Sequence, residues 1–431
     1  MALLPGRKLG SRTLRFGHKG PDVMQLHAFL RLQGYDLGTE EDFGYLTKDA
    51  VKRWQRDHGL VADGIAGKRF FALALKKNVP IRRRVHVAEP GETLDQIAKL
   101  YGVGPGAFGG SLHKQTIYPG QRLIFFDREI WGICTSVPKG EVHLGRLATG
   151  GQSKEALTGL VYQRSPADLP QGSCVIKPVV GEDANVVEIH HHLRTPWARR
   201  RTAQNLLESA EAPCCHGLYL PWRAVASLDG RRYLKLLKLL RRRLKPPAML
   251  WVELGPEVPR WKLWGGVDYS CVNSLVDRVV LDVPPPKEPG VLFERSRGEE
   301  LVDWLLPSVH SWKILLKVPV YALQWEFRSE DREAEVGPSR LPYQTALSRA
   351  FRHGARLSQD EEGFPYYAYK QRGTEYHIRL PHHSLMEDVS AVANRHNLAG
   401  LILDELGMED PRIWQNLTMH FRPASLNISD Q

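Results

Sequence analysis

The 431-residue sequence lacks any apolar run close to the roughly 18 residues that a membrane-spanning helix requires. Its best candidate, residues 314–323, is interrupted by Lys317 and Pro319. The N-terminal stretch MALLPGRKLGSRTLRFGHKG has neither an apolar core nor a small-residue cleavage site, so we do not expect a Sec signal peptide. These absences exclude a membrane protein and argue against ordinary Sec export.

Cysteine is also scarce. The sequence has five cysteines, an odd number without a CxxC pair: Cys134, Cys174, Cys214, Cys215 and Cys271. Such a set indicates neither a disulfide framework nor a zinc knuckle. We expect these side chains to be buried as small apolar groups in a protein of a reducing compartment.

One histidine-rich segment, EIHHHL at residues 188–193, is a candidate metal site. If it forms a strand, Glu188, His190 and His192 share one face and could hold zinc. No cysteine or carboxylate at a familiar spacing completes such a site, and a polar strand end or loop is the alternative. We therefore predict no metal and no cofactor.

The composition is that of a globular protein, with 42% apolar and 25% charged residues, and the length suits two or three domains. Lysine and arginine number 59 against 48 acidic residues, which gives a net charge of +11. A basic surface favours a polyanionic partner, either nucleic acid or an acidic wall polymer. Charge alone does not decide between them.

Residues 13–78 have the pattern of a small helical domain. Two segments place apolar residues at three- and four-residue spacing, and DGIAG closes the unit with glycines suited to a turn. The stretch GPDVMQLHAFLRLQGYDLG…DFGYLTKDAVKRWQRDHGLVADGIAG resembles the three-helix peptidoglycan-binding domain of wall hydrolases. The resemblance implies an anchoring module. The spaced residues are Val23, Leu26, Phe29 and Leu30 in the first segment, and Ala50, Val51, Trp54 and Gln55 in the second.

Residues 84–127 predict a strand, a helix and a second strand. VHVAEPGETLDQIAKLYGV and IYPGQRLIFF resemble a LysM repeat, a βααβ module that binds glycans containing N-acetylglucosamine. The resemblance implies glycan contacts at the PGET and YPGQ turns, namely at Gly91, Glu92, Thr93, Pro119 and Gly120. We expect Thr93 to cap a helix with one apolar face, formed by Leu94, Ile97, Ala98 and Tyr101.

Residues 128–431 alternate short apolar runs with longer amphipathic stretches, at a spacing that suits βα units. The pattern predicts a (β/α)8 TIM-type barrel with an insertion, and places chemistry at the C-terminal strand ends. The eight predicted strands are EIWGICT, LTGLVY, CVIKPVV, HGLYLPW, AMLWVEL, RVVLDV, KILLKVPVYAL and GLILDEL.

Several stretches of this region resemble glycoside hydrolase family 18, particularly its spore-cortex branch, in which LysM modules precede the barrel. KILLKVPVYALQW (313–325) is similar to the family's strand 7. FPYYAYKQRGTEYHIRL (364–380) is similar to its small α+β insertion, and HNLAGLILDELGMEDPRIWQNL (396–417) to its last strand and helix. The resemblance implies a glycosidase scaffold.

The catalytic motif of that family has changed. The family carries DxxDxDxE on strand 4, with the glutamate as general acid. Here the three aspartate positions are His216, Tyr219 and Pro221, and the glutamate position is Arg223. An arginine keeps its charge because its pKa lies above about 12, so it cannot donate the proton. No catalytic residue remains by family motif.

Strands 6 and 8 have changed as well. Pro284 and Pro285 replace the tyrosine and aspartate that hold the substrate acetamide, and Asp404 replaces the tryptophan expected on strand 8. The family's substrate-assisted mechanism needs a well-placed proton donor and a held acetamide group. We therefore expect that this mechanism does not operate.

Two interpretations of the barrel remain. In the first it is a pseudoenzyme that binds glycan or protein, with Trp222, Trp251 and Trp261 stacking on sugars; ordinary barrel packing is the alternative role for each tryptophan. In the second, a rebuilt site uses three relocated carboxylates as general acid and base. Ion pairs with Arg223, His216 or a lysine are the alternative role for these carboxylates, which are Glu253, Asp282 and Asp404.

A basic amphipathic helix is predicted over RRYLKLLKLLRRRLK (231–245). Such helices can bind membranes or nucleic acid, but its position suits an outer helix of the barrel, with its arginines near wall phosphates or carboxylates. Its expected inward residues are Tyr233, Leu236, Leu237, Leu240 and Leu244.

Together these observations predict a peptidoglycan-binding protein with an inactive family-18-like barrel, which acts in spore wall assembly or germination. The alternative is an N-acetylglucosaminidase-type hydrolase with relocated carboxylates. The expected partners are peptidoglycan and a spore coat or cortex protein; nucleic acid rests on charge alone. The resemblance implies a location in the spore coat or cortex, or in the mother-cell cytoplasm.

Overall fold

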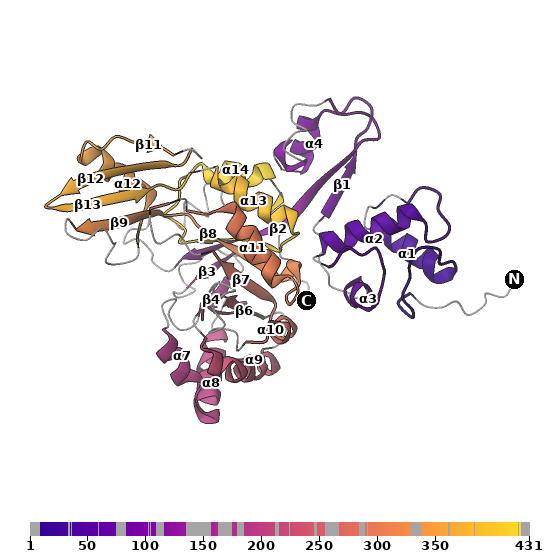
Figure 1. Cartoon of the computed structure of the whole chain (residues 1–431), viewed down its shortest axis with the longest axis horizontal. Helices are drawn as coiled ribbons and strands as arrows, with labels where there is room; N and C mark the ends of the chain where they lie inside the picture. Colours follow the sequence, from indigo (N-terminus) through magenta and orange to yellow (C-terminus); the bar gives the residue numbers. More distant parts are fainter. Residues whose placement is uncertain are drawn as a thin grey trace.

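The computed structural model describes residues 9–423 except 33–34, 36, 59, 75–82, 102, 104, 109–115, 135–156, 163–174, 179–184, 212–214, 224, 245–247, 255–266, 284–288, 291, 329–337, 361–362, 383 and 421. Three helices occupy one side of the molecule and an antiparallel sheet the opposite side, with a parallel sheet and its helices between them (Figure 1). Among the described residues, no helix combines the length and the apolar character that crossing a bilayer requires.

The N-terminal helices are α1 (Pro21–Leu32), α2 (Tyr45–Asp57) and α3 (Lys68–Ala74). Their inward residues form one apolar cluster, and Trp54 at its centre is 1% exposed. Gln55 fixes the DGIAG turn: its side-chain NH2 donates to Asp63 Oδ1 (2.7 Å) and to the Ile65 carbonyl (3.0 Å), and its Oε1 accepts from Gly64 N (2.9 Å). The predicted amphipathic repeats therefore build this core and its last turn.

Residues 83–126 form strand β1 (Arg83–Val87), helix α4 (Leu94–Tyr101), the 3-10 turn η1 (Pro105–Phe108) and the first part of β2 (Arg122–Cys134). β1 pairs with β2 in antiparallel register from Arg83–Phe126 to Val87–Arg122. Thr93 caps α4 as predicted: its Oγ1 accepts from Gln96 N (3.3 Å), and its own N–H donates to Gln96 Oε1 (2.9 Å). Ile97 and Ala98 are buried in the small core of this unit.

The second part of β2 opens a closed ring of eight parallel strands. The ring runs through β3 (Gly159–Tyr162), β4 (Val175–Pro178), β5 (Gly217–Leu220), β6 (Met249–Leu254), β7 (Arg278–Asp282), β8 (Ile314–Pro319) and β14 (Gly400–Asp404). β14 returns to pair with β2, and the added β15 (Arg422–Pro423) also pairs with β2. Each of the eight predicted segments contributes one strand. We call this ring the closed sheet.

Glycine at position 400 permits the closure between β14 and β2. A Cβ atom at Gly400 would lie 1.9 Å from the backbone oxygen of Glu129, so no larger residue fits this register. A buried bidentate ion pair lies beside this register. Arg278 donates to the Glu129 carboxylate through Nε (2.8 Å) and through a terminal nitrogen (2.5 Å). The indole N–H of Trp131 donates to the same carboxylate (3.1 Å).

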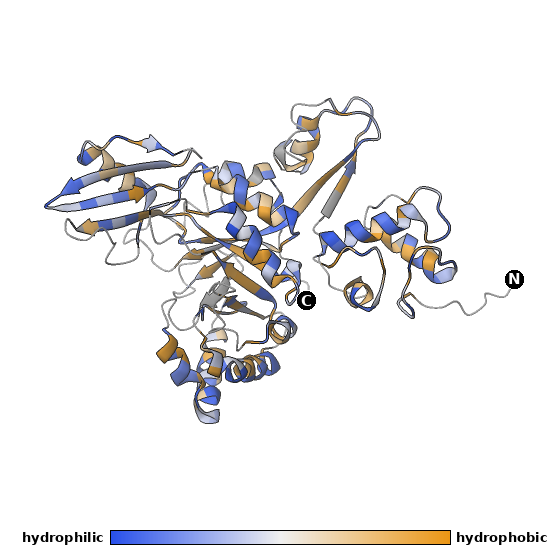
Figure 2. Ribbon diagram, viewed as in Figure 1, coloured by the Kyte–Doolittle hydropathy of each residue, from blue (hydrophilic) through white to orange (hydrophobic). Residues whose placement is uncertain are grey.

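Helices cover the outside of the closed sheet. They carry apolar residues on the side that meets the strands, and Figure 2 shows both colours on most of them. On α9, Tyr233, Leu236, Leu237 and Leu240 are buried as predicted. The covering elements are α7 (Val186–Leu193), α8 (Pro196–Ala210), η4 (Ser227–Asp229), α9 (Gly230–Arg243), α10 (Tyr269–Leu275), α11 (Arg295–Leu305), η6 (Ser311–Lys313), α13 (Leu385–Arg395) and α14 (Ile413–His420).

The insertion between β8 and α13 is a five-stranded antiparallel sheet with one helix. The 364–380 segment, which resembles the family's small α+β insertion, forms the antiparallel pair of β12 and β13 within it. Its elements are β9 (Ala322–Arg328), β10 (Ser339–Leu341), α12 (Tyr343–Arg352), β11 (Ser358–Gln359), β12 (Pro365–Gln371) and β13 (Thr374–Arg379).

The prediction of a strand or loop at EIHHHL is wrong, because this segment forms helix α7. Asn185 and Glu188 make a capping box: the Asn185 side chain accepts from Glu188 N (3.0 Å), and the Glu188 carboxylate accepts from Asn185 N (3.1 Å). In a helix, His190 and His192 point in different directions. His190 Nδ1 pairs with Asp229 Oδ2 (2.8 Å), whereas His192 Nδ1 bonds Thr202 Oγ1 (3.1 Å).

The cysteines are free thiols where the structure describes them. Cys134 is buried as predicted, whereas Cys215 and Cys271 are partly exposed, contrary to the prediction. Cys271 lies in the first turn of α10, away from the sheet, and its thiol donates to Asp268 Oδ2 (3.1 Å). Cys174 and Cys214 lie outside the described residues.

Candidate functional site

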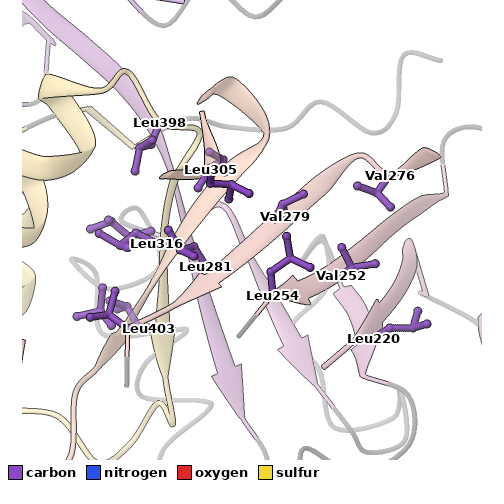
Figure 3. Close-up of a cluster of buried hydrophobic side chains, with 14 of the residues drawn as sticks. Leu220, Val252, Leu254, Val276, Val279, Leu281, Leu305, Leu316, Leu398 and Leu403 are labelled. Carbon is purple, nitrogen blue, oxygen red and sulfur yellow. The ribbon is translucent and has the colours of Figure 1, made fainter. Parts of the chain in front are cut away.

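Side-chain alternation places four ionisable residues inside the closed sheet at the C-terminal ends of its strands. Glu253 is the penultimate residue of β6, on the same face as Trp251. Asp282 and Asp404 end β7 and β14, and Lys317 on β8 pairs in register with Asp282. The neighbouring residues point outward, into the apolar layer under the helices. Figure 3 shows this outer layer, which includes Leu254, Leu281, Leu316 and Leu403.

The three candidate carboxylates are joined by two cations. A terminal nitrogen of Arg223 contacts Asp282 Oδ2 at 2.8 Å, and Arg223 Nε lies 3.4 Å from Glu253 Oε1. Lys317 Nζ lies 3.4 Å from the same Glu253 oxygen and 3.5 Å from Asp404 Oδ1. We call these five residues the ion-pair chain. Positive and negative groups alternate along its whole length.

The insertion closes the Asp404 end of the ion-pair chain. Arg340, from β10, places a terminal nitrogen 3.5 Å from Asp404 Oδ2 and 3.9 Å from Glu405 Oε1. Tyr321 donates its hydroxyl to Asp404 Oδ2 at 3.0 Å, and the Arg340 guanidinium lies 4.7 Å above the Tyr321 ring. Asp404 therefore has a cation on each side and a hydroxyl donor.

Burial shifts the pKa values of groups in the ion-pair chain. The side chains of Glu253, Lys317 and Asp404 are 0%, 2% and 3% exposed. Burial raises the pKa of Glu253, although Lys317 and Arg223 favour its charged form. Burial disfavours the charge of Arg223, but Glu253 and Asp282 outweigh it and raise its pKa. Arg223, which is predicted from the sequence to align with the family's proton donor, is thus held in its cationic form.

The strand-4 motif positions fall around β5. Tyr219 points into the closed sheet and donates its hydroxyl to Glu253 Oε2, so both Glu253 oxygens have partners. His216 precedes the strand, and its backbone oxygen accepts from Met249 N at 2.9 Å. Pro221 is buried just after the strand. General acid catalysis needs a protonated group within hydrogen-bond reach of the leaving oxygen, and Glu253 presents no surface for such contact.

The candidate sugar-stacking tryptophans lie within the protein. Trp222 is 1% exposed and packs between His192 and Tyr233 in the layer under the helices. Trp251 is 0% exposed and meets Trp131 edge-on at 4.5 Å inside the closed sheet. Packing therefore accounts for the position of both rings. Trp261 lies outside the described residues, as do Pro284 and Pro285.

The PGET and YPGQ turns lie side by side. Ala88 N donates to the Gln121 carbonyl (2.9 Å), and Gly120 N donates to the Ala88 carbonyl (2.7 Å). Gly91 and Gly120 have positive φ values of 87° and 81°, which the two tight turns require. Pro119 is exposed beside Gly120.

Glu92 in this unit is held by its neighbours rather than projecting freely. Its carboxylate accepts from Glu89 N (2.7 Å) and from His86 Nε2 (2.9 Å). These two bonds hold the pKa of Glu92 below its usual range.

A cavity of about 480 Å³ lies between the N-terminal helices and the loop that follows α11. Its first wall comes from the DGIAG turn and the start of α3, with Asp63, Lys68 and Arg69. Its second wall is residues 306–310. Trp312 packs against the apolar cluster of the three helices, next to this second wall. The volume lies within the ~300–1,000 Å³ range of ligand sites.

The described residues do not bring a set of metal ligands together. No group of three or more histidine, cysteine, aspartate or glutamate side chains is arranged for a metal ion in the parts of the chain that the structure describes. Glu188, from the histidine-rich segment, is engaged in the capping box of α7.

The sequence identified only some of the groups that neutralise the three carboxylates. It named Arg223, His216 and an unspecified lysine as partners, but not Lys317, Tyr321 or Arg340. A lysine within the apolar strand ILLKVP was the available signal, because a buried lysine in a central strand needs a carboxylate partner. Arg340 carried no local signal, since the insertion brings it back across about 60 residues of sequence to Asp404.

The comparisons with known proteins agree with the fold. Residues 19–73 match the family described as "Putative peptidoglycan binding domain". The chain is 23% identical over 244 residues to "Putative sporulation-specific glycosylase YdhD" of Bacillus subtilis, a match that covers 55% of this chain and 55% of that protein. The chain thus spans about half the length of the curated relative that it matches.

Solved structures of similar fold include two spore cortex-lytic enzymes. SleL of Bacillus cereus has a TM-score of 0.58 at 17% identity, with 96% of this chain and 99% of that chain covered. SleL of Bacillus megaterium has a TM-score of 0.56 at 16% identity, with 81% and 89% covered. A chitinase of Chromobacterium violaceum has a TM-score of 0.55 at 18% identity, with 67% and 98% covered. The chain therefore shares the fold of spore cortex-lytic enzymes and chitinases, and its N-terminal helices match a peptidoglycan-binding domain.

Proposed function

We propose that this protein binds spore-cortex peptidoglycan and carries a (β/α)8 barrel of glycoside hydrolase family 18 type that does not cleave it. Its role is spore wall assembly or germination through binding. The similarity to sporulation and cortex-lytic proteins of Bacillus supports this setting. The proposed location is the spore coat or cortex, with synthesis in the mother cell, and a coat or cortex protein is the proposed protein partner.

Wall binding is assigned to the N-terminal units. The family match over residues 19–73 supports a peptidoglycan contact there, and residues 84–127 are proposed as a LysM repeat that binds N-acetylglucosamine units through its two adjacent turns. The cavity beside the DGIAG turn is the proposed seat of a wall fragment. Lys68 and Arg69 at its edge suit the carboxylates that peptidoglycan peptides carry.

The inactivity of the barrel rests on a single observation, the position of Arg223. It replaces the family's proton donor, and its guanidinium neutralises Glu253 and Asp282 at 3.4 and 2.8 Å. A fixed cation at this point repels the oxocarbenium-like charge that develops during glycoside cleavage, and it supplies no proton. The ion-pair chain therefore replaces the catalytic acids rather than rebuilding them.

Sedimentation with purified cortex peptidoglycan tests the binding part of the proposal. The wild-type chain is expected to pellet with the polymer. Ser308→Trp fills the cavity from its second wall, so it should weaken pelleting by roughly tenfold or more, a loss typical of a blocked contact. Ser348→Trp is the matched control, because Ser348 is exposed on α12 away from the cavity. A wild-type chain that stays in the supernatant refutes wall binding.

The rival function is an N-acetylglucosaminidase-type hydrolase that uses Glu253, Asp282 and Asp404. It draws support from the raised pKa of Glu253, a property of general acids. This rival predicts release of new reducing ends from the polymer, and loss of that release in Glu253→Gln or Asp282→Asn. Equal, background-level release by wild type and both variants rejects it.

A further inference from the structure

A cationic groove lies on the outside of the closed sheet, between α8 and α9. Its volume is about 280 Å³, and Pro196 and Leu239 provide its apolar lining. The other lining residues are all basic. They are Arg199, Arg200, Lys235, Lys238 and Arg242. We call this feature the α8–α9 groove.

Helix geometry explains why the charges gather here. Lys235, Lys238 and Arg242 lie three and seven residues apart on α9, so they share one face of that helix. The opposite face carries the leucines that pack against the strands. Arg200 is exposed on the neighbouring α8 and reaches the groove from the other side. Two packed helices thus present their cations to a common space.

The groove cations differ from their neighbours because they have no carboxylate. On the same helix, Arg232 pairs with Asp229 (2.8 Å) and Arg241 pairs with Asp277 (2.7 Å). Within the described part of the chain, Arg200, Lys235, Lys238 and Arg242 make no ion pair.

Arg199 at the back of the groove adds to the positive potential. It is 7% exposed and donates to the Leu193 carbonyl at 2.5 Å. Burial lowers its pKa, and the charge of Arg232 lowers it further. A concave site with this much unbalanced charge concentrates anions.

The shape of the groove favours one class of anion. Membrane insertion is excluded, because the apolar face of α9 is packed against the strands. A pocket of this volume holds a compact group rather than a long stretch of duplex. Trp197 follows Pro196 and is 67% exposed, with Arg201 5.2 Å above its ring. An exposed indole beside cations suits an organic acid attached to a sugar or peptide more than bare phosphate.

We propose that the α8–α9 groove binds the carboxylates of peptidoglycan stem peptides and gives the barrel its own wall contact. The proposal rests on the proposed wall-binding function. Under this proposal the barrel itself attaches to the wall, through a groove on the outside of the closed sheet rather than through the ion-pair chain inside it. Two attachment points on one polymer raise the overall affinity by about 10²–10⁴-fold over one, provided that both engage together.

Charge reversal tests the groove in the full-length protein. Lys235→Glu/Lys238→Glu should raise the polymer concentration for half-maximal sedimentation by at least about tenfold at about 0.15 M salt, because the barrel's own attachment is lost. Arg352→Glu/Arg356→Glu is the matched control. These arginines are exposed on the insertion, and the change in net charge is the same. The control should bind like wild type. Circular dichroism and the urea midpoint verify that both variants fold.

A second arm identifies the ligand. Cortex peptidoglycan with its carboxyl groups converted to amides should bind wild type at least as weakly as native polymer binds the groove variant. The same conversion should weaken the groove variant less than wild type, because only the proposed contact at Lys68 and Arg69 remains to be lost. If the groove variant matches the control on native polymer, the inference is wrong although wall binding stands. If the variant loses affinity only for polyphosphate or duplex DNA, the groove serves phosphates and the inference is also wrong. Absence of wild-type binding overturns the proposed function and the inference together.

Discussion

Lys317 is the cation between Glu253 and Asp404 in the ion-pair chain, and its removal gives the sharpest test of the site as a structural element. Lys317→Met keeps the length and apolar stem of the side chain but leaves Glu253 and Asp404 without their shared partner. Both carboxylates are almost fully buried, so water cannot replace the lost charge. Breaking a buried pair from one side costs about 3–5 kcal/mol in the free energy of unfolding.

This loss corresponds to a fall in the melting temperature of about 6–20 °C, at about 2–4 °C per kcal/mol for a domain of this size class. Urea unfolding of the full chain, followed by tryptophan fluorescence, measures it, since Trp131 and Trp251 lie inside the closed sheet. Lys370→Met is the control: Lys370 is 78% exposed and pairs with Glu375, so its loss should change stability by no more than about 1 kcal/mol.

A double variant separates the charge effect from packing. Lys317→Met/Glu253→Gln removes the cation together with one of its acids, so it should lose less stability than the two single variants added together. A coupling energy of about 0.5–3 kcal/mol is expected for residues in contact. If the free energy of unfolding of Lys317→Met stays within about 1 kcal/mol of wild type, the ion-pair chain does not stabilise this end of the barrel.

Two further predictions follow from the buried groups. Burial raises the pKa of Glu253 above its ordinary value of 4.5, so the folded state keeps a proton that the unfolded chain releases. The contribution of this group to stability is therefore complete below pH 4.5, and it declines as the pH rises toward the folded-state pKa. Glu253→Gln should therefore flatten the fall in stability as the pH rises above 4.5, and an unchanged slope in urea unfolding contradicts this. Burial, followed by Glu405 and Glu409, raises the pKa of the Cys134 thiol from 9.0 to about 12. A difference of three units means roughly 10³-fold less thiolate, so iodoacetamide at pH 8 should leave Cys134 unmodified in the native protein, as read by peptide mass spectrometry; rapid labelling would place it at the surface.

The strands were predictable because parallel strands buried on both faces read as short continuous apolar runs. GLILDEL and RVVLDV show the pattern, and the same runs indicate which residue ends each strand. The order of strands in the ring followed from the expected βα connections. The wrong assignment at EIHHHL has a local cause, since a segment of eight helical residues is too short for periodicity to separate helix from strand. The Asn185–Glu188 capping box was the more informative signal.

The site was predictable only in part. Strand ends identify Glu253, Asp282 and Asp404 as neighbours, because parallel strands bring their C-terminal ends to one rim. The balance of charge among them was not predictable, since it depends on Lys317 from the strand between Asp282 and Asp404 and on Arg340 from the insertion. The resemblance to a hydrolase aligned Arg223 with the general-acid position, and the structure adds that this arginine is paired with Asp282 and Glu253.

The most direct test of a non-catalytic barrel is turnover by the wild-type protein. The purified full-length chain is incubated for hours with spore-cortex peptidoglycan, and new reducing ends are counted beside a no-protein control and an active cortex-lytic enzyme. With Arg223 ion-paired at the proposed acid position, release should equal the no-protein control while the protein pellets with the polymer. Release clearly above that control would mean that the carboxylates of the ion-pair chain still cleave glycan, and the account of this barrel as a binding scaffold would be wrong.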